Sequence, residues 1–593
     1  MSSSLADAEF AKAAEHHRHG DLPEAERACR RTLELTPNHF GAHYLLGVIA
    51  LQRGAFEDAE RSIRLALAIN PNVPPAHRHH GVALMQLGRF EEAFASLSKA
   101  IALKADDAEA FGQRANALQE LERFEEAVRD YDQAVVLRPD FFPAYNNRGL
   151  ALARLNRLDE ALASIDRAIA LKPDYTAAHK NRGDVLMALK RNGDALASYN
   201  RVIALAPKSA AALNNRGNIL KDLERFDEAL ESYDAAIAAA PNLAEAWYNR
   251  GIVLLELKRP HDALSSYDRA IALKPDYAEA LVGRGLCKLA MGRFDTGWRD
   301  YENRWRVPSH PALYAPTNAP LWLGEDLRDR SIVVCAERGM GDIIHFSRYV
   351  PMLAERGARV SLLVPQKLQR ILGGLPETVR ITSMVADSDR FDFHCALMSL
   401  PCLLDVERAD TPLSIPYLAI DARRAADWKR RIGEDGFKIG ICWQGAAWQG
   451  GASITGRALP LAAFHSLSQI EGVRLISLQK EGGLEQLANM PAGMKVETLG
   501  DDFDAGADAF VDTIAVMEHL DLIVTCDTSI AHVGGARGRP VWIALRHVPE
   551  WRWGLEGDTT PWYPTARLFR QRTRGDWAGV FADMASELKK LTR

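Results

Sequence analysis

The amino-acid sequence predicts an α-solenoid followed by an α/β region made of two lobes. Three observations carry this prediction. Prolines recur every 34 residues in the first half, short β-branched runs alternate with helical stretches in the second half, and eleven of the twelve tryptophans lie from Trp298 onward. The 593 residues exceed what one hydrophobic core normally holds, so we expect several domains.

The first half is built of repeats. Two of its units, "AYNNRGLALARLNRLDEALASIDRAIALKP" (144–173) and "ALNNRGNILKDLERFDEALESYDAAIAAAP" (212–241), each contain two apolar stripes at helical spacing and a glycine where the helices cross. A 34-residue helix–turn–helix period resembles tetratricopeptide repeats (TPR). We expect about nine units over 1–309, stacked into a superhelix with a concave inner surface. A proline closes the second helix of most units: Pro37, Pro71, Pro139, Pro173, Pro207, Pro241 and Pro275.

Asparagine and arginine recur together in four of these units. An asparagine amide can donate to and accept from one peptide unit, so a stacked row can hold an extended chain without reading its sequence. We predict that four asparagines bind a protein acceptor: Asn147, Asn181, Asn215 and Asn249. The arginines that follow them have an alternative role, because aspartates of the same period can pair with them: Arg148, Arg182, Arg216 and Arg250 with Asp132, Asp166, Asp234 and Asp268.

The second half alternates strand-like and helix-like segments, which is typical of parallel α/β sheets. The repeat pattern ends in an aromatic stretch, 293–305, as expected where a terminal repeat packs on another domain, and 310–325 reads as a linker. We expect two Rossmann-like lobes, 326–425 and 436–593, the second ending in a closing helix. The expected strands are 331–336, 359–365, 438–443, 473–479, 521–527 and 540–545.

Two turns at the ends of expected strands can carry chemistry, because ligands of such sheets bind beyond the carboxyl ends of the strands. The first is "ERGMGD" (337–342), whose glycines allow close backbone approach and whose Asp342 lies in the first turn of a helix. The alternative is that Asp342 only caps that helix.

The second turn is "DTSIAH" (527–532). Asp527 ends a strand, Thr528 and Ser529 begin a helix, and His532 follows one turn later. Free N–H groups and the positive end of a helix dipole suit a diphosphate. The alternative is a plain helix cap with a buried structural histidine.

These motifs resemble bacterial heptosyltransferase-like glycosyltransferases (glycosyltransferase family nine), in particular the branch fused to TPR repeats. The architecture is also similar to O-GlcNAc transferase and to the TPR-linked transferases that modify flagellin. The resemblance covers most of the second half and rests on the turn at 339–342, "DFHCALMSLP" (392–401), Arg457–Leu461, "SLQ" (477–479), "DTSIAHVGGARGRPVW" (527–542), "WRW" (551–553) and "WYP" (562–564).

The resemblance implies a GT-B enzyme, with a nucleotide-sugar in the second lobe and catalysis in the cleft between lobes. Asp342 matches the proposed catalytic base, and we expect Gly341 and His345 beside it to contact the acceptor. The residues matched to donor binding are Asp527, Thr528, Ser529, His532 and Arg457, with Ser529 in place of the usual glycine.

Transfer of a sugar needs a base for the acceptor hydroxyl and positive charge for the departing phosphate. GT-B enzymes generally need no metal, so we predict none and assign that charge to Arg457, Lys480 and the helix that begins at 528. Lys480 has the alternative of a surface charge. Gln444 and Trp443 could face the base or sugar, as could Trp551 and Trp553, although tryptophans more often lie in cores.

Composition narrows the function classes. The net charge of −5 and the pI near 6.4 do not indicate a nucleic-acid-binding protein. No apolar run approaches the roughly 18 residues that a membrane-spanning helix needs. Scattered cysteines without zinc spacing indicate a cytoplasmic protein. We predict a glycosyltransferase that uses a nucleotide-sugar as co-substrate and modifies Ser or Thr of a protein such as flagellin, with no other cofactor. The alternatives are a polysaccharide or lipid-linked glycan transferase and a binding scaffold with an inactive transferase half.

Overall fold

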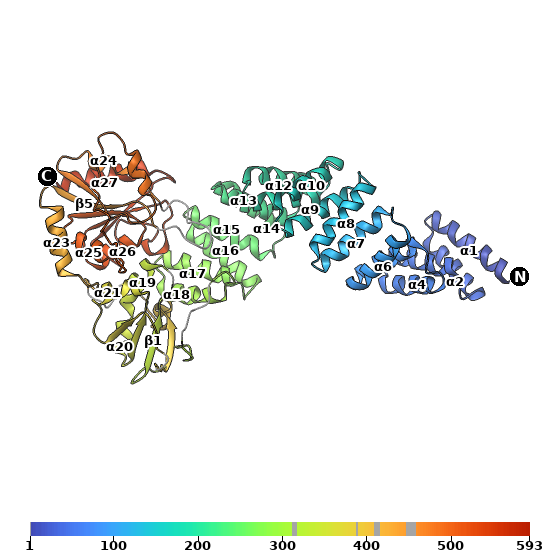
Figure 1. Cartoon of the computed structure of the whole chain (residues 1–593), viewed down its shortest axis with the longest axis horizontal. Coiled ribbons are helices and arrows are strands. Elements are labelled where there is room, and N and C mark those ends of the chain that lie inside the picture. The colour runs from blue at the N-terminus through green and yellow to red at the C-terminus, as the bar shows by residue number, and fades with distance from the viewer. Residues whose placement is uncertain are drawn as a thin grey trace. The chain divides into compact units, whose positions relative to one another are not determined.

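The computed structural model describes residues 2–310, 317–337, 339–386, 389–407, 415–445 and 458–592. It contains two compact units, Met1–Pro241 and Asn242–Arg593. Figure 1 labels their helices and strands. The first unit is entirely helical, and the second combines four further helices of the repeat series with two parallel sheets.

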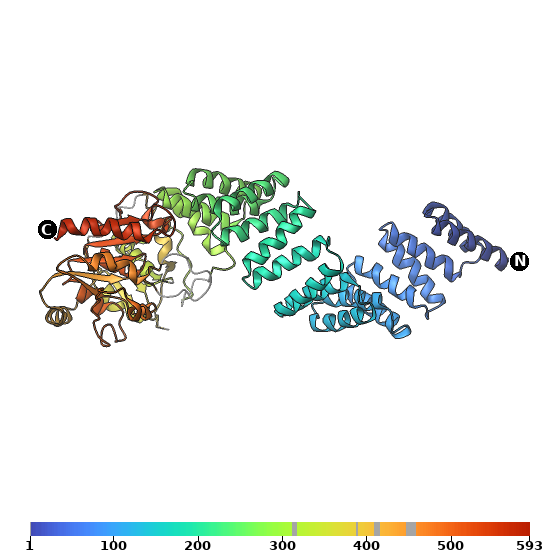
Figure 2. The ribbon, with the colours of Figure 1, turned by 90° about the horizontal axis from the view of Figure 1, so that it is seen from above.

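Eighteen helices form nine antiparallel pairs, which confirms the predicted α-solenoid; Figure 2 shows pairs of the first unit stacked side by side. The pairs of the first unit are α1 (Ser2–Arg18) with α2 (Leu22–Leu35), α3 (Phe40–Gln52) with α4 (Phe56–Ile69), α5 (Pro74–Gln86) with α6 (Phe90–Leu103), α7 (Ala108–Glu120) with α8 (Phe124–Leu137), α9 (Phe142–Arg154) with α10 (Leu158–Leu171), α11 (Thr176–Ala188) with α12 (Asn192–Leu205), and α13 (Ala210–Asp222) with α14 (Phe226–Ala239). Those of the second unit are α15 (Ala244–Glu256) with α16 (Pro260–Leu273) and α17 (Ala278–Ala290) with α18 (Phe294–Tyr301).

In six of the pairs a glycine of the first helix packs against a large side chain of the second. At Gly149, an added Cβ would lie 2.4 Å from Cγ1 of Ile165 and 3.0 Å from the carbonyl oxygen of Ala161. At Gly217, the neighbour is the ring of Tyr233. The absence of a side chain therefore lets the two helices approach until the large residue fills the crossing point.

The first lobe is a four-stranded parallel sheet in the order β3-β2-β1-β4. Its central strands are the predicted ones, whereas β3 and β4 lie at the edges and were not predicted. The elements are β1 (Ser331–Cys335), α19 (Met340–Phe346), η2 (Ser347–Tyr349), α20 (Pro351–Glu355), β2 (Arg359–Leu363), α21 (Gln366–Leu372), β3 (Val379–Thr382), β4 (Phe393–Ala396), η3 (Leu397–Ser399) and α22 (Leu400–Leu403).

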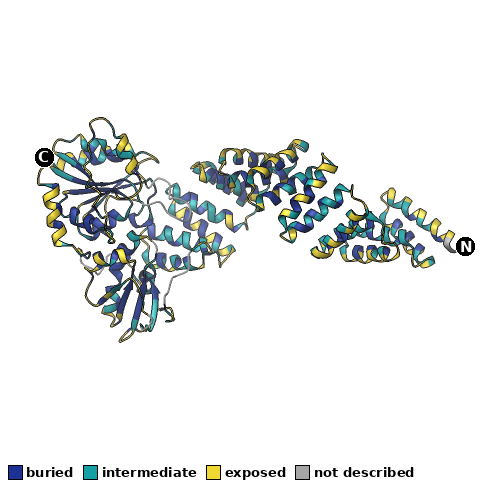
Figure 3. Cartoon of the chain, in the orientation of Figure 1, coloured by how far each residue is buried: buried dark blue, intermediate teal, exposed yellow. Residues whose placement is uncertain are grey.

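The second lobe is a five-stranded parallel sheet in the order β6-β5-β7-β8-β9. Figure 3 shows the central strands of both sheets as buried. The elements are α23 (Ala422–Ile432), β5 (Phe437–Cys442), η4 (Leu461–Phe464), α24 (His465–Ser468), β6 (Val473–Ser477), η5 (Leu484–Asn489), α25 (Val511–Met517), β7 (Leu522–Cys526), α26 (Ser529–Ala536), β8 (Val541–Leu545), η6 (Trp551–Trp553), β9 (Ala566–Arg570) and α27 (Trp577–Leu591).

The terminal repeat packs on the α/β lobes within the second unit. Trp298 of α18 is 2% exposed and meets the rings of Trp551 and Phe346 edge-on, at 5.1 and 5.9 Å between centroids. The compact unit accordingly begins at Asn242, whereas the sequence placed the change at 309. Part of the expected linker also joins the fold, because the amide of Trp322 donates to the carbonyl of His394 in β4 (2.8 Å).

Candidate active site

The two turns singled out in the sequence meet. Gly341 in the first turn of α19 faces the first turn of α26, where an added Cβ would lie 3.0 Å from Cδ2 of His532 and 3.4 Å from Cα of Ser529. Both helices start at the carboxyl edge of their own sheet, after β1 and β7. The two lobes thus bring the Asp342 turn and the Asp527–His532 turn to one place, where parallel sheets bind ligands.

Asp342 is paired with an arginine that the sequence reasoning did not select. One of its carboxylate oxygens accepts a hydrogen bond from Nη2 of Arg552, and Nη1 of Arg552 donates to Glu550 at 2.6 Å. Arg552 is 8% exposed, whereas the side chain of Asp342 is 30% exposed. Burial alone would lower the pKa of Arg552, but the carboxylates of Glu550 and Asp342 raise it above its usual value. Burial raises the pKa of Glu550, and Arg552 opposes that shift.

Two buried histidines share one tyrosine hydroxyl behind the turns. Nδ1 of His532 lies 2.9 Å and Nδ1 of His345 lies 3.3 Å from the hydroxyl of Tyr563. A hydroxyl has one hydrogen, so it donates to one ring and accepts from the other. Burial lowers the pKa of His345 well below its usual value, aided by the charges of Arg348 and Arg552. His345 is fully buried, so in this structure it supports the Asp342 turn from inside.

One glutamine joins the loops that follow β5 and β6. Gln479, which follows β6, accepts from the amides of Trp443 and Gln444 (both 3.1 Å) and donates to the carbonyls of Gln444 and Glu481 (both 2.7 Å). It therefore ties the loop after β5 to the loop after β6. Thr528 at the start of α26 lies beside this loop, with its hydroxyl 3.0 Å from that of Thr525.

The remaining donor-side predictions are placed differently. Trp443 is fully buried, and its indole N–H donates to the carbonyl of Gly483 (3.1 Å), so its ring lies in the core of the second lobe. Lys480 is exposed and donates to the carbonyl of Phe503 (2.6 Å). Arg457 lies outside the described residues. Trp553 is also buried, and it stacks on His532 with 5.4 Å between ring centroids.

Three predicted rungs of the asparagine row make hydrogen bonds inside the repeat array. Asn147 donates to Asn116 (3.1 Å), Asn181 donates to Asn146 (2.9 Å), and Asn215 donates to the hydroxyl of Tyr199 (2.8 Å). Asn181 is only 8% exposed, whereas the other rungs, including Asn249 in the second unit, are half-buried. An amide nitrogen carries two hydrogens, so one such bond leaves a rung able to donate elsewhere.

Two of the four arginines next to these rungs pair with aspartates, as the alternative interpretation expects. Nε of Arg148 donates to Asp132 (2.6 Å) and Nε of Arg182 donates to Asp166 (2.7 Å). In the next unit Arg216 donates to Asn200 instead (2.9 Å). These arginines therefore connect successive helices of the array.

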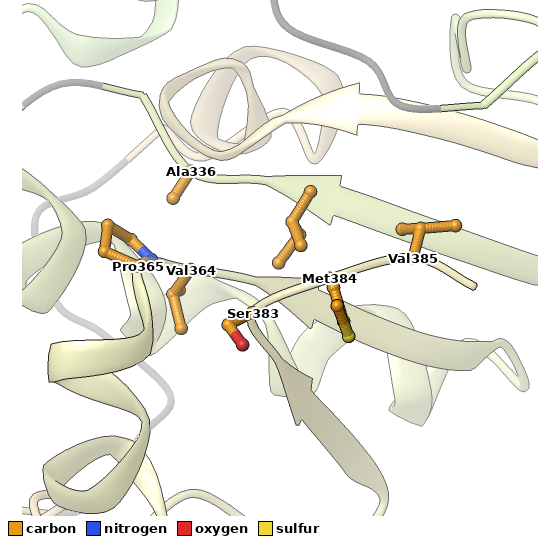
Figure 4. A pocket seen from close by; sticks show the side chains of 7 residues that line it. Ala336, Val364, Pro365, Ser383, Met384 and Val385 are labelled. Carbon is orange, nitrogen blue, oxygen red and sulfur yellow. The ribbon is translucent and has the colours of Figure 1, made fainter.

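A cavity of about 330 Å³ opens at the carboxyl edge of the first sheet. Figure 4 shows its lining side chains, which come from the ends of β1, β2 and β3: Ala336, Leu363, Val364, Pro365, Ser383, Met384 and Val385. The lining is mostly apolar. The cavity lies in the lobe that carries Asp342.

A second buried ion pair ties the terminal repeat to the loop that leads to Asp342. Arg304 is 2% exposed and donates to Glu337 (3.1 Å), the residue that lies two positions after β1. The other carboxylate oxygen of Glu337 accepts from the amide of Met398 (2.7 Å). Arg304 and Arg552 were not selected from the sequence. Each stands beside a tryptophan in an aromatic stretch, and this local pattern is the sequence signal that could have indicated them.

Among the described residues, none of the helices has the length and apolar character that a membrane span requires. No group of three or more histidine, cysteine, aspartate or glutamate residues in the described part of the chain is arranged to hold a metal ion.

The chain is similar to several known proteins over part of its length. The chain is similar to Protein FlbA of Caulobacter vibrioides, with 26% identity over 329 residues that make up 51% of this chain and 53% of FlbA, so it spans about half the length of that relative. Among solved structures, YrrB, a TPR protein with an unusual peptide-binding site, is 28% identical and has a TM-score of 0.29, covering 31% of this chain and 95% of YrrB. PilF of Pseudomonas aeruginosa is 20% identical with a TM-score of 0.32, covering 35% of this chain and 94% of PilF.

Two family models cover most of the repeat region. The tetratricopeptide repeat model matches 10–74, 113–176, 155–210, 180–244, 214–278 and 248–308, and a TPR repeat model matches 81–122. These matches coincide with the nine helix pairs. The chain up to residue 308 is therefore an array of tetratricopeptide repeats, followed by an α/β region with two parallel sheets.

Proposed function

We propose that this protein is a glycosyltransferase that moves a sugar from a nucleotide-sugar to a Ser or Thr hydroxyl of a protein held by the repeats. One observation carries the proposal. The glycine turn with Asp342 and the helix start at Asp527–His532 come from different sheets and lie against each other. Such a pair supplies an acid–base group and an anion site at one place, which sugar transfer requires.

Each part of the site has a role in this reaction. The acceptor oxygen attacks the anomeric carbon, Asp342 takes the hydroxyl proton, and the bond from the anomeric carbon to the phosphate oxygen breaks with its electrons on the phosphate. The start of α26 with Asp527, Ser529 and His532 binds the donor, and the N–H groups of this helix face the diphosphate. The loop with Gln444, fixed by Gln479, reaches the start of α26, because an added Cβ at Gly445 would lie 3.5 Å from Cγ2 of Thr528.

The repeats supply the acceptor in this proposal. Half-buried asparagines of one register can hydrogen-bond an extended main chain, as the resemblance to O-GlcNAc transferase implies. Flagellin is the acceptor that the resemblance to TPR-linked flagellin transferases suggests.

The donor is tested by thermal shift of the whole chain with UDP-, GDP-, ADP- and CMP-sugars, because a ligand that binds only the folded state raises its apparent stability. We expect one nucleotide class to raise the midpoint. The class that does so is then used for transfer assays with intact-mass analysis of candidate acceptor proteins. No shift with any donor would contradict the proposal.

The base is tested by Asp342→Asn. This nearly isosteric change should leave donor binding in place and lower transfer by roughly 100-fold or more, since it removes the proton acceptor. Asp326→Asn, an exposed acid of the same lobe that pairs with Arg328, is the matched control and should transfer normally. Full transfer by Asp342→Asn would reduce Asp342 to a helix cap.

The acceptor row is tested by changing Asn147, Asn181, Asn215 and Asn249 together to alanine. We expect a higher KM for the acceptor and unchanged hydrolysis of the donor without acceptor. Asn146→Ala is the control, because Asn146 is 3% exposed and shares the same internal hydrogen bonds without being a rung. An equal rise of KM in both variants would mean that the bonds matter only for the fold.

The internal bonds of the rungs favour a second candidate. Asn181 is nearly buried and already bonded to Asn146, which suits a structural role. In that case the transferase half acts on a polysaccharide or lipid-linked glycan, and the repeats serve assembly. Normal modification of a protein by the four-asparagine variant would exclude the acceptor row, and glycan acceptors would be tried next.

A further inference from the structure

Arg552 is built to hold two partners at once. It lies in η6, and its guanidinium donates through Nη1 to Glu550 (2.6 Å) and through Nη2 to Asp342. The flat group also lies over the ring of Trp551, 4.6 Å from the centroid, and 5.4 Å from that of Phe346. The aromatic contacts and Glu550 fix the guanidinium in place, while its second fork points at a residue of the other lobe.

The two partners of Arg552 differ in how easily they can be exchanged. Glu550 precedes Arg552 by two residues, caps the same short helix by accepting from the amide of Arg552, and has a side chain that is 17% exposed. Asp342 belongs to the other lobe and is 30% exposed. A ligand that reaches the two turns can therefore compete for the Nη2 side of Arg552 without disturbing Glu550.

Two requirements of the proposed reaction conflict with the pairing seen here. A carboxylate bound to a guanidinium is stabilised as the anion, and such a group accepts a proton less readily. A diphosphate that reaches the two turns meets negative charge, because Asp342, Glu550 and Asp527 all act on Arg552. Both conflicts are resolved if a phosphate oxygen accepts the hydrogen bond from Nη2 of Arg552 and the carboxylate of Asp342 turns toward the acceptor hydroxyl.

We propose that Arg552 is a catalytic residue that exchanges partners, binding Asp342 in the free protein and the diphosphate of the nucleotide-sugar in the donor complex. The exchange places a cation on the leaving phosphate and frees the carboxylate of Asp342 to take the proton of the acceptor hydroxyl. It would make donor binding a condition for an active base. This inference rests on the proposed function, and it adds a residue that neither the sequence motifs nor the family matches assign.

The decisive measurement is the affinity of Asp342→Asn for nucleoside diphosphates. If Asp342 competes with the diphosphate for Arg552, the neutral amide is a weaker competitor, and the variant should bind UDP, GDP or ADP, whichever the parent binds, about tenfold more tightly. Titration calorimetry on the full chain gives both dissociation constants. Glu587→Gln on α27 removes the same charge from an exposed ion-pair cluster and should leave the affinity unchanged.

A double-mutant cycle assigns the effect to Arg552. In an Arg552→Gln background the gain from Asp342→Asn should disappear, and the diphosphate should bind more weakly than to the parent. Arg552→Lys is the second background in case the neutral variant does not fold. A lysine is a point charge that cannot serve Glu550 and a second ligand through a rigid fork, so the gain should shrink there too.

The outcomes separate this inference from the function on which it rests. Binding of a nucleotide by the parent with equal or weaker binding by Asp342→Asn overturns the exchange and leaves the proposed function standing. A gain that persists without Arg552 also overturns it. If neither protein binds any of the three diphosphates, the exchange falls, and the proposed function falls with it only when no donor, CMP-sugars included, raises the melting midpoint of the parent.

Discussion

Arginines are paired in two different ways in this protein: in exposed pairs along the repeat array, and in buried pairs in and next to the α/β lobes. In the array, an arginine before the second helix of successive pairs bonds an acid three residues later, as Arg157 does with both oxygens of Glu160 (2.7 Å each). The side chains of these arginines are 36–50% exposed: Arg89, Arg123, Arg157, Arg191, Arg225 and Arg259. Exposed pairs of this kind contribute little to stability, because water screens them.

Three buried arginines in or next to the α/β lobes instead join distant segments. Arg304 connects the terminal repeat to Glu337, and Arg348, which has no exposed surface, donates to the carbonyls of His345 (2.8 Å) and Trp562 (3.0 Å). Arg552 joins the two lobes through Asp342. A buried charge is costly unless it is paired with an opposite charge. Removal of one partner therefore leaves the other charge buried without compensation, which lowers the free energy of unfolding.

This difference teaches how each region is stabilised. A repeat array spreads its stability over many similar contacts between neighbours, so that no single pair is essential. The α/β unit concentrates it in contacts that occur once. Substitutions at matched arginines and at a packed glycine test this contrast.

The largest effect is expected for Arg304→Met. The change leaves Glu337 buried without its cation and should lower the free energy of unfolding of the second unit by about 3–5 kcal/mol. Urea unfolding of the full chain followed by tryptophan fluorescence measures it, because eleven of the twelve tryptophans lie from Trp298 onward.

Two further variants serve as controls for Arg304→Met. Arg299→Met, an exposed arginine of α18 five residues before Arg304, should change little. The double variant Arg304→Met/Glu337→Met should recover much of the loss, since it removes both charges. A loss below about 1 kcal/mol in Arg304→Met would mean that the buried pair does not hold the terminal repeat to the first lobe.

A smaller effect is expected for Gly149→Ala inside the array. The new Cβ would lie 2.4 Å from Ile165, so the helix pair must open, at a cost of about 1–3 kcal/mol. Gly193→Ala in α12 is the control, because its Cβ meets nothing within 4 Å and should gain up to about 1 kcal/mol from helix propensity. Melting followed by circular dichroism reports both. Equal behaviour of the two variants would contradict the packing described at the crossing.

The smallest effect is expected for Arg157→Ala, which removes one exposed member of the arginine series. We expect no measurable shift of the melting midpoint, because Glu160 returns to water when its partner is removed. The same melting experiment checks this. A shift as large as that of Gly149→Ala would show that the repeated pairs support the array after all.

The periodic half could be predicted almost completely from the sequence. Proline and glycine recur there for local reasons, at helix ends and helix crossings, so each helix pair repeats the same evidence. In the α/β region, the central strands and the edge strand β6 were predicted from their apolar β-branched runs. The missed strands β3, β4 and β9 all lie at sheet edges, where only one neighbour selects the sequence and short polar runs such as "VRIT" suffice.

The candidate site divides in the same way. The turns at Asp342 and at Asp527–His532 were predictable, because glycines, helix-starting residues and strand ends are local signals. Their partners were not: Arg552 is 210 residues from Asp342, and Tyr563 lies 218 residues from His345. From the sequence, Trp443 was a candidate to face the base or sugar of a ligand, but the fold buries it completely.

Local order along the chain thus determined the helical repeats, the central strands and the two turns. Only the tertiary structure decided which arginine meets Asp342, which ring lies behind His532 and which tryptophans are core. The physical reason is that propensity and periodicity act over a few residues, whereas burial and charge pairing depend on segments that the fold brings together from far apart.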